Sequence, residues 1–230
     1  MSQGGDSNSG SGSSSISLES FVPILEAPSS SETGSETLGG LLGDEVAATN
    51  TRKLALNEAL LNLLPKDLAF QDFMRELLLS FQKVVPSEAG TIFELDQESN
   101  SLFFRAVSGQ ASDTVTKFLI PIGQGIVGFV AESRKSAKVD QVQDNARHIK
   151  AIQAAVGFSP NNLVAVPIFV RGKIYGVLEL LNRIGEPNFK ASDVELLEYA
   201  VSMASKVIET RLVIAWALNQ NSAATEKKSA

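Results

Sequence analysis

Apolar residues along the chain change their spacing several times, and each change predicts a different element. From Asn50 onward the segment TRKLALNEALLNLLP has a helical pattern. Pro65 must end or kink this helix, because proline lacks the amide donor for the next turn. A second helix is expected from about Lys66, with apolar residues three or four apart on one face. Those residues are Phe70, Phe73, Leu77, Phe81 and Val84.

Strand-like runs follow the two helices and are arranged as hairpins. AGTIFELD and SLFFRAVS, joined by QESN, predict an antiparallel pair. A third strand is expected around TVTKFLIPI, followed by a short helix at about 125–134, a short strand AKVDQV and an amphipathic turn or helix DNARHIKAIQAAV. NLVAVPIFV and KIYGVLELLN flank Arg171 and Gly172, which is typical of a tight hairpin. The pattern predicts an α+β fold with a central antiparallel sheet of about five to six strands and helices on its faces.

The last predicted element is a helix over about 191–219, far longer than the average of about 11–12 residues. Ser192 or Ala191 precedes Asp193 and Glu195, whose charges complement the positive end of the helix dipole. Two adjacent apolar stripes run along the helix. One holds Leu197, Val201, Ala204, Ile208 and Ala215, and the other holds Leu196, Met203, Val207, Ile214 and Leu218. A helix apolar over so wide an arc usually packs against two neighbours, so we expect a homodimer bundled through the long N- and C-terminal helices.

Composition divides the chain into segments. Residues 1–50 contain no Lys or Arg, seven acids, 13 Ser and 8 of the 17 Gly, and cannot bury enough apolar surface to fold alone. We expect an acidic disordered tail over 1–50, a helical linker over 51–65, one folded domain over 66–219 and a disordered C-terminus over 220–230. Residues 16–28 are either chance apolar residues within the tail or a peptide that docks on a partner protein.

Charge and cysteine content exclude several classes of function. The net charge of -6 lies in the first fifty residues, and the remaining chain carries 20 basic and 19 acidic side chains. This balance gives no electrostatic reason to expect nucleic acid or an anionic membrane as a partner. The N-terminal segment MSQGGDSNSG lacks the basic start and apolar run typical of a signal peptide, and no window approaches about 20 apolar residues, so we expect a cytoplasmic protein. The absence of cysteine excludes disulfides, thiolate metal sites and cysteine nucleophiles.

The stretch IPIGQGIVGFVAES places Gly123, Gly125 and Gly128 in the spacing G-x-G-x-x-G. A dinucleotide-binding fold needs this turn inside a β-α-β unit, with an acid about 20 residues further on. Asp140 resembles that acid, but the flanking segments read as hairpins. A protein kinase would need His-Arg-Asp and Asp-Phe-Gly motifs downstream, and the chain has neither.

Candidate acid-base residues do not converge in the sequence. His148 is the single histidine, and a lone histidine on a polar helix is more often structural or solvated. Asp140 and Asp144, like Asp193 and Glu195, lie among charged neighbours without an apolar setting that would raise a pKa. We therefore expect no catalytic residue, no metal site and no enzyme activity.

Taken together, the order of elements and the motifs resemble the GAF domain, a small sensory module. The matching segments span about 66–219 and are GTIFELD, IPIGQGIVGFVAES, VQDNARHIKAIQAAVGF, NLVAVPI, and GVLELLNR with NFKASD downstream. The resemblance implies that the glycine run turns into a short helix that helps close a small-molecule pocket. Its amides would lie near the ligand, as a helix N-terminus favours anions.

The resemblance also implies which residues line that pocket. They are Thr91, Ile126, Val127, Gln153, Val156, Pro160 and Glu179. Thr91, Ile126 and Glu179 are compatible with purine binding. Gln153 replaces a usual Asp, and Val156 and Pro160 replace hydroxyl-bearing residues. Each hydrogen bond lost to a buried polar ligand would cost on the order of 1 to 3 kcal/mol.

Members that bind cyclic nucleotides carry an Asn-Lys…Phe…Asp-Glu signature. Here Asn182, Arg183, Phe189 and Asp193 occupy the first four positions, and Val194 stands where Glu would be. The signature is chiefly structural, and the resemblance implies that Arg183 pairs with Asp193.

We therefore expect a non-catalytic regulatory module that acts through protein–protein contacts, can be modulated by a ligand and needs no cofactor. The alternative is a sensor of cyclic AMP or cyclic GMP, and another small ligand is a further option. Chromophore-attaching members and the methionine sulfoxide reductases of this fold use a cysteine, so the resemblance implies neither activity for this chain.

Overall fold

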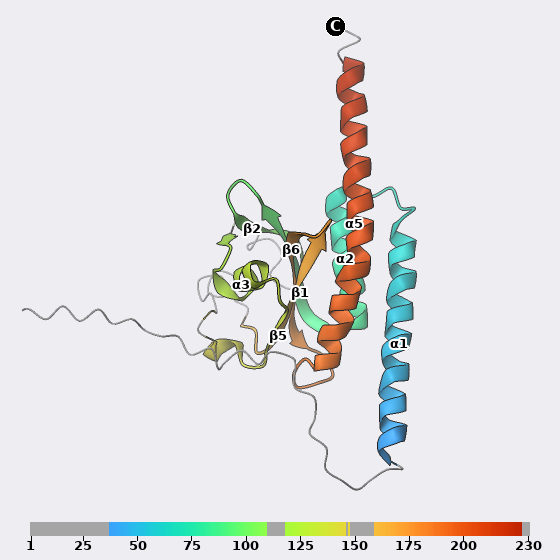
Figure 1. The fold of residues 1–230 in the computed structure, drawn as a ribbon, viewed down its shortest axis with the longest axis vertical. Helices are drawn as coiled ribbons and strands as arrows, with labels where there is room; N and C mark the ends of the chain where they lie inside the picture. The colour runs from blue at the N-terminus through green and yellow to red at the C-terminus, as the bar shows by residue number, and fades with distance from the viewer. Residues whose placement is uncertain (1–36, 110–117, 146, 148–158, 227–230) are drawn as a thin grey trace, which may run out of the picture. The chain divides into compact units, whose positions relative to one another are not determined.

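The protein is described by a computed structural model that covers residues 37–109, 118–145, 147 and 159–226. An antiparallel sheet lies between a layer of long helices and a side on which a short helix packs (Figure 1). The strands are β1 (Ser87–Asp96), β2 (Ser101–Ser108), β3 (Leu119–Pro121), β4 (Ala137–Val139), β5 (Leu163–Val170) and β6 (Lys173–Arg183). The helices are α1 (Thr37–Leu63), α2 (Phe70–Val84), α3 (Gly125–Ser133) and α5 (Ala191–Glu226), and a 3-10 turn, η3, spans Val142–Asp144.

The strand order in the described sheet is β3-β2-β1-β6-β5-β4, and every pair is antiparallel. Both predicted hairpins are present, β1 with β2 and β5 with β6. Arg171 and Gly172 join the second hairpin with φ angles of 51° and 74°, as a two-residue type I′ turn requires. The glycine run is thus preceded and followed by antiparallel strands, which is not the setting of a dinucleotide turn.

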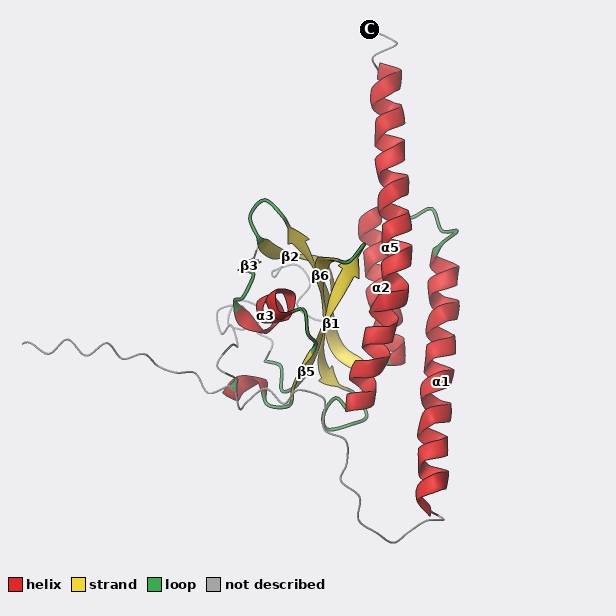
Figure 2. Cartoon of the chain, viewed as in Figure 1, coloured by secondary structure: helices red, strands yellow, loops and turns green. Residues whose placement is uncertain are grey.

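One face of the sheet packs against α2 and α5, and α1 lies outside them as a further layer (Figure 2). The apolar face predicted for α2 is confirmed, because Phe73, Leu77, Phe81 and Val84 are buried. They pack with sheet residues whose side chains point to the same side. The sheet contributes Ile92, Ala106, Val164, Val166, Ile168, Leu178 and Leu180, and α1 contributes Leu56, Leu60 and Leu63.

The two apolar stripes predicted for α5 both find neighbours within the chain. Leu197, Ala204 and Ile208 of the first stripe are buried in the helix-side core. Leu196 and Val207 of the second stripe are buried in the same core, to which α1 contributes. Met203, which lies between them on the same stripe, is 39% exposed, so the described part of the second stripe is only partly covered within the chain.

Two predicted boundaries fall inside helices. α1 begins at Thr37, within the segment 1–50 that composition assigned to a disordered tail, and α5 continues past residue 219 to Glu226. The serine-rich sequence that predicted disorder stops early, since no serine occurs between positions 36 and 79. The last residues of α5 extend a helix that is already nucleated, and extension costs far less than initiation. None of the helices in the described part of the chain is long and apolar enough to cross a membrane.

Gly176 is the point at which β6 passes closest to β1. A Cβ atom at this position would lie 1.9 Å from the carbonyl oxygen of Phe93. We expect Gly176→Ala to lower the free energy of unfolding by roughly 3 kcal/mol, because the two central strands would have to separate locally. Urea unfolding followed by circular dichroism measures the change. Gly43→Ala, where nothing lies within 4 Å, is the matched control and should stay within about 1 kcal/mol of wild type. Equal stability of the two variants would contradict the close approach.

Candidate functional site

The three glycines of the G-x-G-x-x-G stretch form the turn from β3 into α3. Gly123 and Gly125 have φ angles of 83° and 68°, in the left-handed region that favours glycine. At Gly128 a Cβ atom would lie 2.6 Å from the carbonyl oxygen of Pro121. The Gly123 N–H donates to the carbonyl oxygen of Gly128 at 2.9 Å, which closes the turn. Each glycine therefore has a backbone reason for its position, and the spacing needs no bound phosphate to explain it.

The turn directs α3 onto the side of the sheet opposite α2 and α5, where it contacts β5 and β6 (Figure 1). Ile126 and Val127, two of the predicted pocket residues, lie in its first turn and are 5% and 4% exposed. Val130 and Ala131 continue the buried face. α3 thus covers part of this side of the sheet with small and branched apolar side chains.

Thr91 and Glu179 are direct partners across β1 and β6. Ile92, Leu178 and Leu180 point into the helix-side core, and side chains alternate along a strand. Thr91 and Glu179 therefore point to the side that carries α3. On its other flank Glu179 is in register with Ala165 of β5, whose small apolar side chain offers the carboxyl no hydrogen-bond partner. The structure thus brings together Thr91 and Glu179, two of the predicted pocket residues, on the face that α3 covers.

Glu179 is the unusual ionisable group of this face. Burial raises the pKa of its carboxyl to about 7, and no charge or hydrogen bond from the described residues offsets that shift. The residue keeps partial exposure, whereas Thr91 is buried. A carboxyl that is half protonated near neutral pH can donate as well as accept a hydrogen bond. Glu179 can therefore recognise a polar group of a ligand by either role.

Four other sequence-predicted positions add little to this geometry. Gln153, Val156 and the candidate His148 lie outside the described residues. Pro160 is described and buried, and its carbonyl oxygen accepts a hydrogen bond from Gln143 Nε2 at 3.1 Å.

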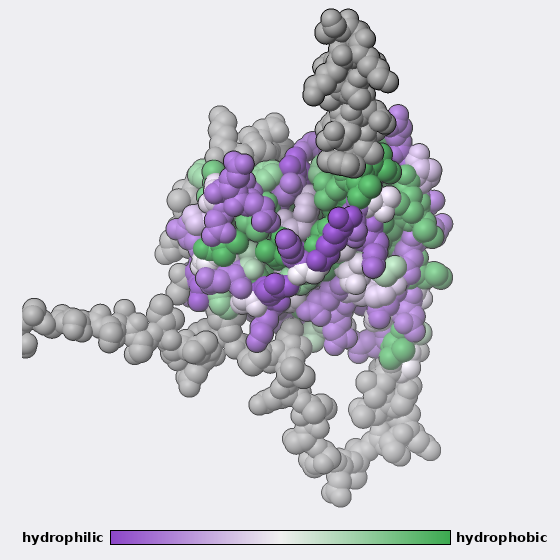
Figure 3. Space-filling view, turned by 45° about the horizontal axis from the view of Figure 1, so that its top comes forward, coloured by the Kyte–Doolittle hydropathy of each residue, from purple (hydrophilic) through white to green (hydrophobic). Residues whose placement is uncertain are grey.

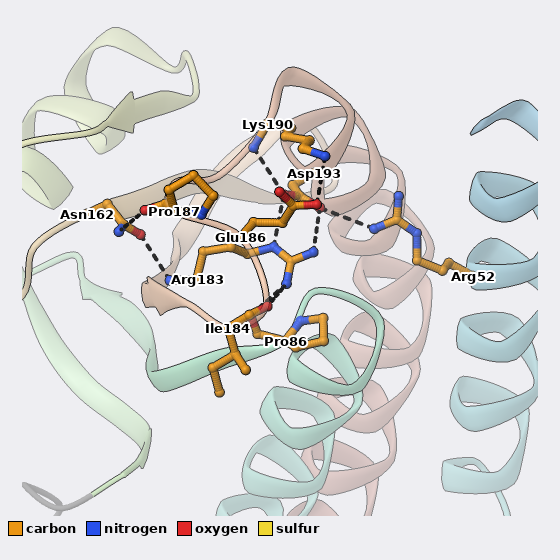
Figure 4. Close-up of polar contacts among 9 residues, drawn as sticks. All are labelled: Arg52, Pro86, Asn162, Arg183, Ile184, Glu186, Pro187, Lys190 and Asp193. Carbon is orange, nitrogen blue, oxygen red and sulfur yellow. Dashed lines mark hydrogen bonds and ion pairs between the residues drawn. The ribbon is translucent and has the colours of Figure 1, made fainter. Parts of the chain in front are cut away.

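The Arg183–Asp193 pair implied by the family signature is formed (Figure 4). Arg183 Nε lies 3.0 Å from Asp193 Oδ2, and its Nη1 donates to the carbonyl oxygen of Pro86 at 3.1 Å. The backbone N–H of Lys190 donates to the same Oδ2 at 3.0 Å, so Asp193 also caps the start of α5. Arg183 thereby ties the end of β6 to the start of α5 and to the loop before β1.

Arg52 of α1 is a further partner of Asp193, at 3.1 Å from Nη1 to Oδ1. Burial by itself would raise the pKa of the Asp193 carboxyl. Hydrogen bonds from Arg183 and from the Lys190 N–H, the charge of Arg183 and the hydrogen bond from Arg52 outweigh burial and leave this pKa lowered. Asp193, whose side chain is 2% exposed, is therefore an ionised carboxylate inside the fold.

The remaining signature residues complete this network. Asn182 has a φ angle of 55°, its Oδ1 accepts the Asn161 N–H at 2.7 Å, and its Nδ2 donates to Glu88 at 2.8 Å. Phe189 is 2% exposed in the helix-side core. Sequence reasoning missed Asn162, whose Oδ1 accepts the Arg183 N–H at 2.9 Å and whose Nδ2 donates to the Pro187 carbonyl at 3.0 Å. It also missed Arg52, because no spacing along the chain links position 52 with position 193.

The carboxylate pairs considered in the sequence do not form a reactive site in the described residues. Both Asp140 oxygens accept from Lys138 Nζ, at 2.6 and 2.7 Å, in an exposed ion pair. Across the part of the chain that the structure describes, no three His, Asp or Glu side chains gather closely enough to hold a metal ion.

The fold and the site together define an α+β module whose sheet has a packed helix layer on one face and α3 on the other. A family model described as GAF domain matches residues 67–209. The match covers more than half of the chain, and the chain belongs to the GAF domain family, whose members are regulatory and ligand-binding modules.

Sequence relatives match the chain over only part of their length. The alpha' subunit of cone cGMP-specific 3',5'-cyclic phosphodiesterase from Mus musculus is 30% identical over 87 residues, which is 38% of this chain and 10% of that protein. The rod alpha subunit from Canis lupus familiaris is 24% identical over 94 residues, or 41% of this chain and 11% of the relative. The chain thus spans about a tenth of the length of these two relatives.

Solved structures share the fold. The GAF domain of an Acinetobacter phosphoenolpyruvate-protein phosphotransferase is 18% identical with a TM-score of 0.59, covering 72% of this chain and 96% of that chain. A free methionine-R-sulfoxide reductase from Neisseria meningitidis, in complex with its substrate, is 18% identical with a TM-score of 0.56, covering 71% and 89%. At these identities the likeness establishes the α+β architecture alone.

The Asp193 network predicts a loss of stability in acid. The pKa of the Asp193 carboxyl is lowered in the folded state. The ionised carboxylate therefore stabilises the fold fully above the unfolded-state pKa of about 3.9, and this stabilisation is lost as the pH falls through the folded-state pKa. Asp193→Asn should unfold more easily by roughly 3 kcal/mol at pH 7, with a shallower decline below about pH 4. Urea unfolding at pH 3 to 7 measures both effects, with the exposed Asp140→Asn as control. Parallel pH profiles for wild type and Asp193→Asn would contradict the assignment.

The raised pKa of Glu179 predicts that the protein becomes less stable as the pH rises. Its pKa is raised to about 7, so ionising it opposes folding from about pH 4.3 upward, and the full penalty is reached above pH 7. We expect wild type to lose about 2 kcal/mol between pH 5 and pH 8, a figure reduced for the partial exposure of the carboxyl. Glu179→Gln should abolish this loss in urea unfolding measurements. A Gln variant that keeps the wild-type slope would show that another group titrates.

Proposed function

We propose that this GAF domain is a non-catalytic regulatory module that acts through contacts with other proteins and is modulated by a small ligand. The proposal rests on one observation, which is that strand β6 carries a residue of the α3 side and also a residue that contacts the terminal helices. Glu179 lies on the α3 side in the middle of β6, and Arg183 at its end shares the Asp193 carboxylate with Arg52 of α1. A ligand that contacts Glu179 therefore acts on the strand that holds the terminal helices in place.

The mechanism we infer is a shift between two arrangements of the α3-side face and the terminal helices. A ligand changes their ratio only by the difference between its affinities for the two arrangements, so a tenfold difference corresponds to about 1.4 kcal/mol. The terminal helices would then present a different surface to a partner protein.

A non-catalytic role is supported by the chemistry of the described face. Its ionisable group, Glu179, has no described acid or base beside it to complete a proton relay. The resemblance assigns a cysteine to the sulfoxide reductases of this fold, and the chain has none. Substrate turnover that depends on His148 or Glu179 would overturn this part of the proposal.

The second candidate function is a sensor of cyclic nucleotides. Two observations favour it. The Glu179 carboxyl lies in register with Thr91 and has no partner among the described residues, and the chain is similar to subunits described as cGMP-specific phosphodiesterases. Against it stand Gln153, Val156 and Pro160, which replace residues that the family resemblance associates with hydrogen bonding to the nucleotide.

Isothermal titration calorimetry with cyclic AMP and cyclic GMP distinguishes the two functions. We expect no binding in the micromolar range, because each missing partner would weaken affinity by roughly 5- to 150-fold. Glu179→Gln and Thr91→Val test the face directly, and the exposed Glu195→Gln is the matched control. Micromolar binding that persists in Glu195→Gln and disappears in the other two variants would contradict the preferred function and establish the sensor.

A further inference from the structure

The loop that follows α3 reaches the helix layer at the edge of the sheet. The sheet separates α3 from α5, because the two helices pack on its opposite faces (Figure 1). At the β4 edge, however, Ser136 Oγ donates to Glu198 Oε1 of α5 at 2.6 Å. Ser136 comes directly before β4, so this hydrogen bond passes beside the edge strand. The α3 side and the helix side are therefore in direct contact there.

Arg134 makes a second connection from the end of α3. It follows Ser133, the last residue of the helix, and its Nη2 donates to the Gly172 carbonyl oxygen at 2.8 Å. Its guanidinium also lies over the ring of Phe169, 4.9 Å from the ring centroid. Phe169 and Gly172 belong to the β5–β6 hairpin. Arg134 therefore attaches the end of α3 to that hairpin.

The same hairpin is also bound to α5. Arg171, the residue before Gly172, has its Nε 2.6 Å from Glu209 Oε1. Glu198 and Glu209 are about three helical turns apart, so both carboxylates lie on one face of α5. Arg134, the turn at Arg171 and Gly172, and Glu209 thus form a series of contacts that leads from α3 to α5.

Both arginines of this series occupy backbone positions that favour glycine. Arg134 and Arg171 have φ angles of 61° and 51°, in the left-handed region. Glycine is the usual residue after a helix that ends in this way, and asparagine is usual before the glycine of a type I′ turn. Neither of these shorter residues could reach the partners of the two guanidinium groups. The contacts of this series therefore depend on the arginine side chains.

We propose that these contacts carry movements of α3 to α5 around the edge of the sheet. α3 spans nine residues, about 13 Å, and a hydrogen-bonded helix of this length moves as one body. A displacement of Ile126 and Val127 in its first turn therefore also displaces Arg134 just beyond its last turn. This route rests on the proposed function, in which a ligand moves α3. It is separate from the connection through Asp193, because it uses neither Arg183 nor Arg52.

The contact at Glu209 lies where α5 leaves the packed part of the domain. Two residues further on, Arg211 Nη2 donates to the Leu63 carbonyl oxygen of α1 at 3.0 Å, so α5 is held by the hairpin and by α1 at the same level. Val213 and Ile214 follow and are 46% and 47% exposed. Apolar surface gathers where the described side chains of α5 end (Figure 3). A displacement of the hairpin would thus move an exposed apolar surface of α5 relative to α1.

Hydrogen exchange of the full chain, measured by mass spectrometry without any ligand, tests the connection. Arg134→Gly removes the guanidinium at a position whose backbone favours glycine, so the end of α3 should stay intact. We expect amide exchange over residues 205–212 of α5 to become roughly two- to threefold faster, although the side-chain contacts of Arg134 are with the hairpin. Arg171→Asn keeps the turn, removes the contact with Glu209 and should accelerate exchange at least as much. Lys135→Ala, at the exposed neighbouring position, is the matched control and should leave exchange unchanged.

A double variant determines whether the contacts act in series. In that case Arg134→Gly adds nothing to the effect of Arg171→Asn, because the second change already interrupts the same route. Additive effects would overturn the proposal, as would an Arg134→Gly chain whose α5 exchanges at the wild-type rate. Arg134→Asn should reproduce the glycine result, which excludes an effect of added backbone freedom.

The outcome is independent of the test of the proposed function. Unchanged exchange in Arg134→Gly would remove this route while modulation by a ligand could still act through Asp193. Conversely, substrate turnover that depends on Glu179 would contradict the proposed function without altering the exchange rates of these variants.

Discussion

The ionised carboxylate of Asp193 is the constraint on which the arrangement of the domain depends. It is almost fully buried, which alone would be unfavourable by several kcal/mol, and it remains charged because three groups donate four hydrogen bonds to it. Arg183 and the Lys190 N–H come from the end of β6 and the start of α5, and Arg52 comes from α1. Removing one partner leaves a buried charge unbalanced, so the positions of these three elements are fixed together. The rest of the helix-side core then packs around a geometry that Asp193 has already set.

The two faces of the sheet have different physical characters. The helix side is closed by branched and aromatic side chains from α2, α5 and α1, so it is a packed core. On the α3 side the register of β1, β6 and β5 places Thr91, Glu179 and Ala165 in one row, where a carboxyl remains without a described partner. A carboxyl whose pKa is raised by burial and which no described residue pairs with is a candidate for ligand binding or for a change of protonation state. Because the two faces differ in this way, Glu179 is the candidate ligand-contacting residue of the α3 side.

Sequence patterns could predict the elements and their pairing but not the long-range contacts. The alternation in AGTIFELD and SLFFRAVS and the turn at Arg171 and Gly172 depend on local geometry, and those elements formed as expected. Residue types that match a family signature likewise anticipated the Arg183–Asp193 pair. Arg52 and Asn162 could not be found in this way, because their roles depend on how distant segments come together in space. The start of α1 was missed for a different reason, since a composition averaged over fifty residues concealed the change that follows position 36.

The glycine spacing shows how a motif can have a physical explanation different from its usual one. Two of its members adopt left-handed backbone angles, and the third lets a carbonyl group approach to a distance that any Cβ would prevent. The result is a tight entry into α3 from an antiparallel strand, which presses Ile126 and Val127 onto the sheet. A phosphate-binding turn needs the same freedom of the backbone, and that is why the two spacings coincide. The two kinds of turn differ in the strands that lead into them. Whether the neighbouring strands pair in parallel or antiparallel therefore indicates whether such a glycine spacing belongs to a phosphate-binding turn.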